Sequence, residues 1–211
     1  MVRQLALPVV FATALMLPLP QAAGAMAQES PSACASTVWL EPLAAAETAE
    51  TGAPTPANAS TWLTAELTDA CSGETFALAD FTGKTIYIEA MATWCLPCRD
   101  QLARVKEAAA LIPEAERAEI VFVALSSEVD LPRETLAEYA AANDFPFIFA
   151  VLPAEMLQTM AEDLGQEIAV PPATPHLIVA PDGTIGEVHT GGISPEDLLA
   201  LLAEARETAA S

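Results

Sequence analysis

Hydrophobic and polar positions along this chain follow two periodicities, one typical of buried strands and one typical of helices. Short runs rich in β-branched and aromatic side chains predict strands at residues 84–90, 119–125 and 147–151. Apolar side chains recur at helical spacing in the segments between and after these runs, at residues 96–111, 132–142 and 153–164. Strands that alternate with helices predict an α/β sandwich.

Two further pairs of strands are predicted to form β-hairpins. They are residues 64–68 with 74–78 and residues 176–180 with 185–189. The turns between them contain Gly73 and Gly183. Ser194 and Pro195 predict the start of a last helix, because Ser caps a helix and Pro fits its first turn. The expected fold is a three-layer α/β/α sandwich with an added N-terminal β-hairpin.

Residues 1–27 have the three parts of a secretory signal peptide. Arg3 supplies a positive charge, an apolar stretch extends from Leu5 to about Pro20, and Ala25-Met26-Ala27 provides a cleavage site. An uncleaved membrane anchor is the alternative, but the apolar stretch is short for a span of about 20 residues. We expect cleavage, export to the periplasm, and a mature form that does not span the membrane.

The rest of the chain divides by composition into a linker and a folded domain. Residues 28–60 are predicted as an N-terminal segment and linker, because residues 41–60 are mostly Ala, Thr, Glu and Pro. Residues 61–211 are predicted as one globular domain. The chain has 29 acidic and 8 basic side chains, a formal net charge of −21, which repels nucleic acids and anionic membranes. We therefore exclude nucleic-acid binding.

The segment Trp94-Cys95-Leu96-Pro97-Cys98 carries the clearest chemical signal in the chain. It follows a predicted strand and begins a predicted helix. At a helix N-terminus, free N–H groups and the helix dipole stabilise a thiolate, which is the form of cysteine that attacks disulfides. We therefore predict a redox site in which Cys95 is the exposed, reactive thiol and Cys98 resolves the mixed disulfide.

Paired cysteines also occur in metal sites, which leaves alternatives for Cys95 and Cys98. A zinc site would need two more ligands, and the sequence has no second pair of cysteines at this spacing. Two thiolates suit Cu(I), so a copper metallochaperone remains an alternative to a redox enzyme. His176 is a candidate metal ligand, but strand alternation turns it away from Pro175, and we favour a structural role for it.

Four motifs occur in the order found in a known family. They are the hairpin segment 67–84, Ala92-Thr93-Trp94-Cys95-Leu96-Pro97-Cys98-Arg99, Ala173-Thr174-Pro175-His176 and Pro181-Asp182-Gly183. On these motifs, residues 63–207 resemble the thioredoxin fold and, within it, the exported TlpA/ResA-like thiol-disulfide oxidoreductases. The resemblance implies a protein disulfide reductase that needs no cofactor and receives electrons from a membrane thiol-disulfide carrier.

The resemblance also implies which residues receive the substrate. The Thr174-Pro175 bond is expected to be a cis peptide that faces the disulfide. The backbone of Thr174 is expected to pair with the incoming partner chain as an added strand. Trp94, next to Cys95, is expected to shield the disulfide and to contact partner proteins. The predicted substrate-binding residues are therefore Trp94, Thr174 and Pro175.

Glu89 lies six residues before Cys95, where thioredoxins carry a buried acid. A carboxyl that is buried without a cationic partner has a raised pKa, which suits it to accept the proton of Cys98. The alternative is a hydrogen-bonded or exposed acid at the end of a strand. Gln101 replaces an acid that is common in the relatives that mature cytochromes, which argues against that subgroup.

Cys34 and Cys71 lie outside the family pattern. If Cys95 and Cys98 pair, the four cysteines of the chain leave these two for each other. A bond between them would be a structural disulfide of an exported protein. Free thiols and an intermolecular bond are the alternatives.

Together these features predict a periplasmic thiol-disulfide oxidoreductase that reduces disulfides of exported proteins through Cys95 and Cys98. The alternative functions are a copper metallochaperone and a thiol reductant for oxidase or cytochrome c assembly. Leu96 and Pro97 stand where the strongest oxidants carry a histidine, which favours a reducing or intermediate potential.

Overall fold

The computed structural model describes Cys34 and residues 60–209. The predicted signal peptide at residues 1–27 lies outside the described residues, as does the predicted segment 28–60 apart from Cys34 and Ser60. Within the described part, no helix is both long and apolar enough to cross a membrane.

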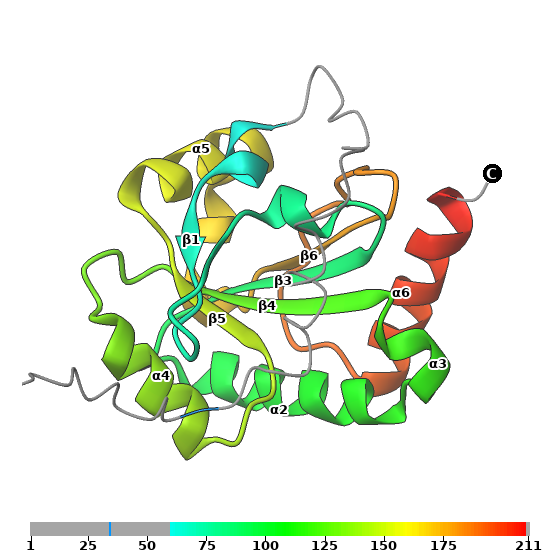
Figure 1. Ribbon diagram of the computed structural model, residues 1–211, viewed down its shortest axis with the longest axis horizontal. Helices are drawn as coiled ribbons and strands as arrows, with labels where there is room; N and C mark the ends of the chain where they lie inside the picture. Colours follow the sequence, from blue (N-terminus) through cyan, green and yellow to red (C-terminus); the bar gives the residue numbers. More distant parts are fainter. Residues whose placement is uncertain (1–33, 35–59, 210–211) are drawn as a thin grey trace, which may run out of the picture. The chain divides into compact units, whose positions relative to one another are not determined.

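A four-stranded mixed sheet forms the centre of the domain, in the order β5-β4-β3-β6 (Figure 1). Its strands are β3 (Thr85–Met91), β4 (Ile120–Ser126), β5 (Ile148–Val151) and β6 (His176–Val179). The strands β5, β4 and β3 run parallel, and β6 pairs antiparallel with β3. Every residue of β3 and β4 is buried, which explains their continuous apolar sequences.

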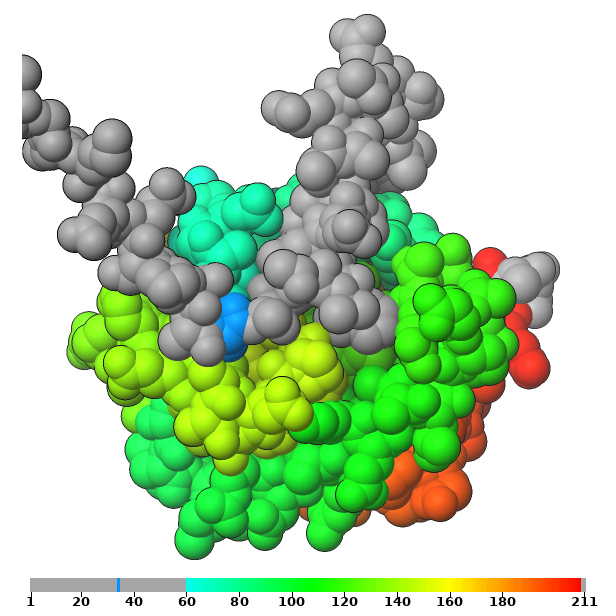
Figure 2. All heavy atoms as spheres, turned by 60° about the horizontal axis from the view of Figure 1, so that its bottom comes forward, coloured from blue at the N-terminus to red at the C-terminus, as the bar shows by residue number. Residues whose placement is uncertain are grey.

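Helices cover both faces of this sheet. They are α2 (Leu96–Leu111), α3 (Glu114–Arg117), α4 (Arg133–Ala142), α5 (Ala154–Leu164) and α6 (Pro195–Ala209). In Figure 1, α2 and α4 lie below the sheet and α5 lies above it. Figure 2 turns the α2 and α4 face forward, with the orange part of the chain that leads into α6 beside α2. The predicted three-layer α/β/α sandwich is confirmed.

The added N-terminal hairpin is present but short. Its strands are β1 (Leu67–Thr68) and β2 (Thr75–Phe76), which pair antiparallel. Oδ2 of the buried Asp69 holds the turn, because it accepts hydrogen bonds from the N–H and the hydroxyl of Ser72 at 2.8 and 2.7 Å. The N–H of Ala70 donates to the carbonyl of Phe149 at 2.6 Å, which docks the hairpin on β5.

The second predicted hairpin is only partly correct. Its first strand is β6, but residues 185–189 form isolated bridges, Val179 with Ile185 and His176 with His189. Between the two bridges, the returning segment contains one more residue than β6 does. This extra residue is a β-bulge, which interrupts the ladder. The predicted cap of the last helix is confirmed, since Ser194 Oγ accepts the N–H of Asp197 at 3.1 Å.

Candidate active site

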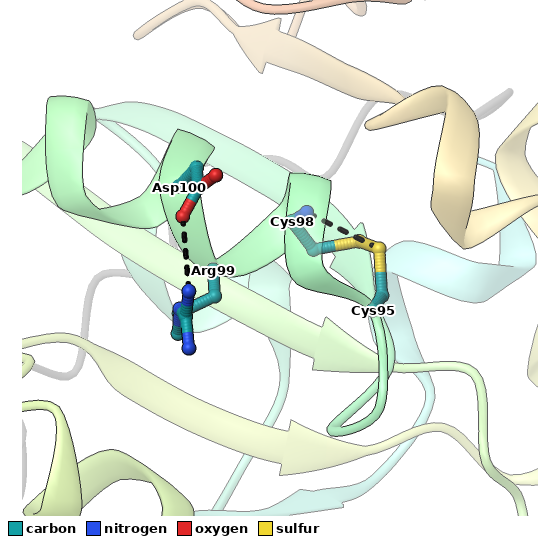
Figure 3. Close-up of polar contacts among 4 residues, drawn as sticks. All are labelled: Cys95, Cys98, Arg99 and Asp100. Carbon is teal, nitrogen blue, oxygen red and sulfur yellow. Dashed lines mark hydrogen bonds and ion pairs between the residues drawn. A yellow bond between two sulfur atoms is a disulfide. The ribbon is translucent and has the colours of Figure 1, made fainter.

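Cys95 and Cys98 form a disulfide bond where the chain leaves β3 and begins α2 (Figure 3). Cys95 is the N-cap residue of α2, and Pro97 lies in the first turn, where a backbone N–H is not needed. The chain enters the helix through a tight turn, in which the N–H of Cys95 donates to the carbonyl of Ala92 at 3.0 Å. The predicted order of strand, turn and helix is confirmed.

The two sulfur atoms have opposite electrostatic surroundings. The N–H of Cys98 points at Cys95 Sγ, with an N to S distance of 3.2 Å. A negative charge on Cys95 would therefore gain a hydrogen bond and the favourable end of the helix dipole. Cys98 Sγ lies 3.0 Å from the carbonyl oxygen of Pro171, which can accept an S–H but repels a thiolate. The reduced site thus favours a thiolate at Cys95 and a thiol at Cys98.

Cys95 is not exposed, contrary to the sequence prediction. Only 2% of its surface is accessible, and Cys98 is fully buried. The cause is tertiary packing, because the short turn η5 (Pro171–Ala173) packs against α2. The exposed apolar side chains near the disulfide are Trp94, Leu96 and Val170. A partner protein would have to approach over these side chains, and Trp94, 62% exposed, offers the largest of them.

The peptide bond between Thr174 and Pro175 is trans, so the expectation of a cis bond was wrong. Thr174 adopts a left-handed conformation, with φ 48° and ψ 54°, and its N–H donates to the carbonyl of Pro171 at 2.7 Å. This turn brings the chain into β6 without a cis bond, and the Pro175 carbonyl accepts the N–H of Ala90 at 3.0 Å. An added partner strand would have to displace the bond that the Thr174 N–H already makes.

Glu89 is fully buried in β3, on the same face of the strand as Tyr87. The Tyr87 hydroxyl donates to Glu89 Oε2 at 3.0 Å, whereas Oε1 has no hydrogen-bond partner among the described residues. Burial raises the pKa of Glu89 to about 8, against a smaller opposing effect of the hydrogen bond from Tyr87. The carboxyl therefore changes its charge near neutral pH, as a proton carrier must.

Gln101 on α2 lies over this face of the sheet, buried and against Tyr87. Its Oε1 accepts the N–H of Ile193 at 2.9 Å, which ties α2 to the segment before α6. A neutral amide makes this link without placing a second negative charge near Glu89. The structure therefore explains an amide at position 101.

Comparison with known proteins places this geometry in a family. Residues 50–202 match the family described as Redoxin. The chain belongs to the Redoxin family. With the Cys95–Cys98 pair, this membership identifies a thiol-disulfide oxidoreductase of the thioredoxin type. A comparison with curated proteins found no match.

Solved structures share the fold at low sequence identity. A thiol:disulfide interchange protein from Chlorobium tepidum TLS is 17% identical, with 67% of this chain and 92% of that chain covered and a TM-score of 0.53. A secreted Mycobacterium tuberculosis disulfide oxidoreductase homologous to E. coli DsbE is 18% identical, with 69% and 99% covered and a TM-score of 0.53. BsSco, of the Sco family of cytochrome c oxidase assembly proteins, is 15% identical, with 67% and 90% covered and a TM-score of 0.52. These similarities show the fold alone.

Glu128 positions the active-site turn of this Redoxin family member, and sequence analysis missed it. Its Oε2 accepts hydrogen bonds from both the N–H and the hydroxyl of Thr93, the residue before Trp94. The two residues are 35 positions apart in the chain, so no local pattern indicates the contact. The bonds join the loop after β4 to the turn that carries Cys95.

Replacement of Glu128 by alanine should loosen this turn. We expect the free energy of unfolding to fall by roughly 2 kcal/mol, because two charge-assisted hydrogen bonds are lost and the Thr93 donors lose their partner. Urea denaturation measures the change. Asp130→Ala, at an exposed position in the same loop, is the matched control and should cost less than about 0.5 kcal/mol. Equal effects of the two substitutions would refute a specific role for Glu128.

Two further pairs of residues, a disulfide and a surface ion pair, lie outside the redox site. Cys34 and Cys71 form a disulfide with their Cα atoms 5.3 Å apart, and Cys71 lies in the turn of the N-terminal hairpin. That hairpin docks on β5, two strands from β3. Arg99 and Asp100 pair at 3.4 Å on an exposed side of α2, away from the disulfide in Figure 3. An exposed pair of this kind contributes little to stability.

Proposed function

We propose that this protein is exported to the periplasm, where its Cys95–Cys98 dithiol reduces disulfide bonds of partner proteins. The observation that carries the proposal is the asymmetry of the pair, in which Cys95 Sγ accepts an N–H and Cys98 Sγ faces a carbonyl. A stabilised thiolate beside a resolving thiol is the arrangement that disulfide reduction requires. Trp94, Thr174 and Pro175 are the proposed substrate-binding residues.

The reaction takes place in two exchange steps. The Cys95 thiolate attacks a sulfur of the partner disulfide, which forms a mixed disulfide and releases one partner thiolate. Cys98 then gives its proton to Glu89, and its thiolate attacks Cys95 Sγ. The Cys95–Cys98 bond forms, the second partner sulfur leaves as a thiolate, and the partner gains the two electrons that the dithiol loses.

Export is supported by three independent features. Residues 1–27 have the composition of a cleaved signal peptide, and residues 28–60 that of a linker to the domain at 61–211. The Cys34–Cys71 bond is of a kind that persists in oxidising compartments. The M. tuberculosis structure with the same fold is that of a secreted protein. In such a compartment the oxidised site needs an electron source, for which we propose a membrane thiol-disulfide carrier.

The order of attack can be tested with single cysteine variants. Reduced Cys98→Ser should accumulate a mixed disulfide with a disulfide-bonded peptide, because Cys95 still attacks and nothing resolves the product. Reduced Cys95→Ser should accumulate little, because Cys98 is held as a thiol. Non-reducing electrophoresis and mass mapping of the adduct measure both. Accumulation in Cys95→Ser instead of Cys98→Ser would reverse the two roles and overturn the proposal.

The direction of electron flow depends on the reduction potential of the pair. Equilibration with glutathione measures it, and we expect a value below roughly −200 mV, in the range of reducing thioredoxin-like proteins. A value near −120 mV, typical of strong oxidants, would indicate that the protein forms partner disulfides and does not reduce them.

Copper delivery for oxidase assembly is the alternative that the two thiols allow, and the Sco family protein shares the fold. Among the described residues, no three His, Cys, Asp or Glu side chains are grouped to hold a metal. A Cu(I) ion would therefore have to bind through the two thiolates alone. Anaerobic titration of the reduced protein with Cu(I), with Cys95→Ser as the control, separates the two functions.

A further inference from the structure

The only two histidines of the chain lie in register with Glu89 across the sheet. Glu89 in β3 pairs directly with His176 in β6, and His176 pairs with His189 on the returning segment. Side chains of directly paired residues project from the same face. The three titratable groups therefore form a row, which extends from a fully buried carboxyl to the exposed side chain of His189.

The backbone pairing brings these side chains close together. His176 and His189 exchange both of their N–H···O bonds, at 2.9 and 2.8 Å. The N–H and C=O of one strand residue point to the same side, so both of these groups of His176 face His189 and neither faces Glu89. His176 and Glu89 therefore form a non-hydrogen-bonded pair, the kind in which side chains come closest. The rings of His176 and His189 stack with centroids 5.7 Å apart. The ring of Tyr87, which is bonded to Glu89, lies 5.8 Å from that of His176.

Hydrogen bonding determines which nitrogen of His176 can take a proton. Its Nδ1 lies 2.9 Å from the carbonyl oxygen of Thr174. A carbonyl only accepts, so Nδ1 carries the hydrogen and Nε2 is the basic nitrogen of the neutral ring. Both Nε2 of His176 and Oε1 of Glu89 are buried without a hydrogen-bond partner among the described residues. Burial lowers the pKa of His176, which keeps the ring neutral and able to accept a proton at pH 7.

A cavity of about 310 Å³ lies between this row and α6. His176 and His189 line it, together with the acidic side chains of Glu187 and Glu204. Tyr87 and Glu89 on β3 are further titratable groups next to His176. The cavity is large enough for several water molecules, and the exposed residues in its lining place it at the protein surface.

We propose that His176 relays protons between Glu89 and solvent beside His189. The relay rests on the proposed role of Glu89 as the acceptor of the Cys98 proton. After that transfer Glu89 is a neutral carboxyl, and its proton passes to His176 Nε2, which leaves a carboxylate and a short-lived imidazolium. The imidazolium gives the proton to water in the cavity at His189. The same path returns a proton to Glu89 before the disulfide is reduced again and Cys98 leaves as a thiolate.

His176→Asn tests the relay. Asparagine keeps an N–H donor for the Thr174 carbonyl but has no nitrogen that accepts a proton. The measurement is the rate at which dithiothreitol reduces the Cys95–Cys98 bond between about pH 6 and about pH 9, sampled by acid quench, alkylation and mass spectrometry. We expect a rate about tenfold lower near pH 7, partly restored by added imidazole. The reduction potential should stay unchanged, because a relay alters rates and not equilibria.

Three results would overturn the relay. The first is an unchanged rate in His176→Asn, and the second is a slower rate that imidazole does not restore. The third is a slower rate with a matching shift in reduction potential, because such a shift would indicate a structural or electrostatic effect. If His176→Asn does not fold, His189→Asn at the exposed position decides the question, and a normal rate there refutes the path. We expect that variant to be about threefold slower, because water can partly replace an exposed ring.

Glu89→Gln, measured in parallel, separates this inference from the proposed function. A slow Glu89→Gln with a normal His176→Asn would refute the relay and leave the role of Glu89 intact. A normal Glu89→Gln would refute the role of Glu89 itself. If Glu89→Gln and His176→Asn are both slow, the double variant should be no slower than Glu89→Gln alone, because the two residues act on one proton in sequence.

Discussion

Glu89→Gln should slow the reduction of a small disulfide substrate roughly 100-fold near neutral pH, the size of effect that a positioned general base provides. Glutamine keeps the shape and can still accept the hydrogen bond from Tyr87, but it cannot take a proton from Cys98. The loss should shrink as the pH rises, because Cys98 then deprotonates without help. The pH dependence of the rate in both proteins measures the effect.

Glu107→Gln is the matched control, since it removes one carboxylate from the exposed side of α2. Its pH profile should follow that of the wild-type protein. A Glu89→Gln profile that also follows the wild type would show that Cys98 loses its proton directly to water or to the partner. Each substitution replaces one carboxyl group with an amide, and Glu107→Gln shows how far a change in the overall charge of this acidic chain affects the rate.

Stability gives a second readout of the buried carboxyl. The pKa of Glu89 is raised from 4.5 to about 8, so between these values the folded protein holds a proton that the unfolded chain has lost. The contribution of Glu89 to the free energy of unfolding should therefore fall by about 1.4 kcal/mol per pH unit across this range. Glu89→Gln removes this slope, and urea denaturation at several pH values should show the variant gaining relative stability as the pH rises.

The elements of the fold could be predicted from the sequence because their signals are local. The apolar runs of β3 and β4 identify strands buried on both faces, and the helical spacing after Cys95 identifies α2. The returning strand at residues 185–189 was overestimated, because a bulge depends on how two segments meet and leaves little trace in either one. Tyr87 could have been found, since it lies two residues before Glu89 and so shares its face of the strand.

The errors at the candidate site have one cause, which is contact between distant segments. The burial of Cys95 depends on the turn at Pro171–Ala173, which is more than 70 residues away and whose position no periodicity reveals. The trans bond before Pro175 occurs together with the left-handed conformation of Thr174, which ends that same turn. Alternation correctly separated His176 from Pro175. It could not show that His176 pairs with Glu89, because strand register is a tertiary property.

Removal of the second disulfide should have the largest effect on stability of any change proposed for this chain. Cys34 and Cys71 are 37 residues apart, and closing a loop of this size should stabilise the folded state by about 4 kcal/mol on the chain-entropy model. The Cys34→Ser/Cys71→Ser double variant should lose about that amount in urea denaturation under non-reducing conditions. Both residues are replaced together, because a single free thiol could exchange with Cys95–Cys98.

The same variant should keep its thiol-disulfide oxidoreductase activity, since the hairpin that carries Cys71 docks on β5 and not at the redox site. In the wild-type protein, mild reductant should open Cys95–Cys98 first, because the N–H of Cys98 and the N-terminus of α2 stabilise the reduced pair, in which Cys95 is a thiolate. Mass mapping after partial reduction and alkylation should then still find the peptides of Cys34 and Cys71 joined. A folded but inactive double variant, or opening of Cys34–Cys71 first, would show that this bond takes part in the redox cycle and is not a structural disulfide.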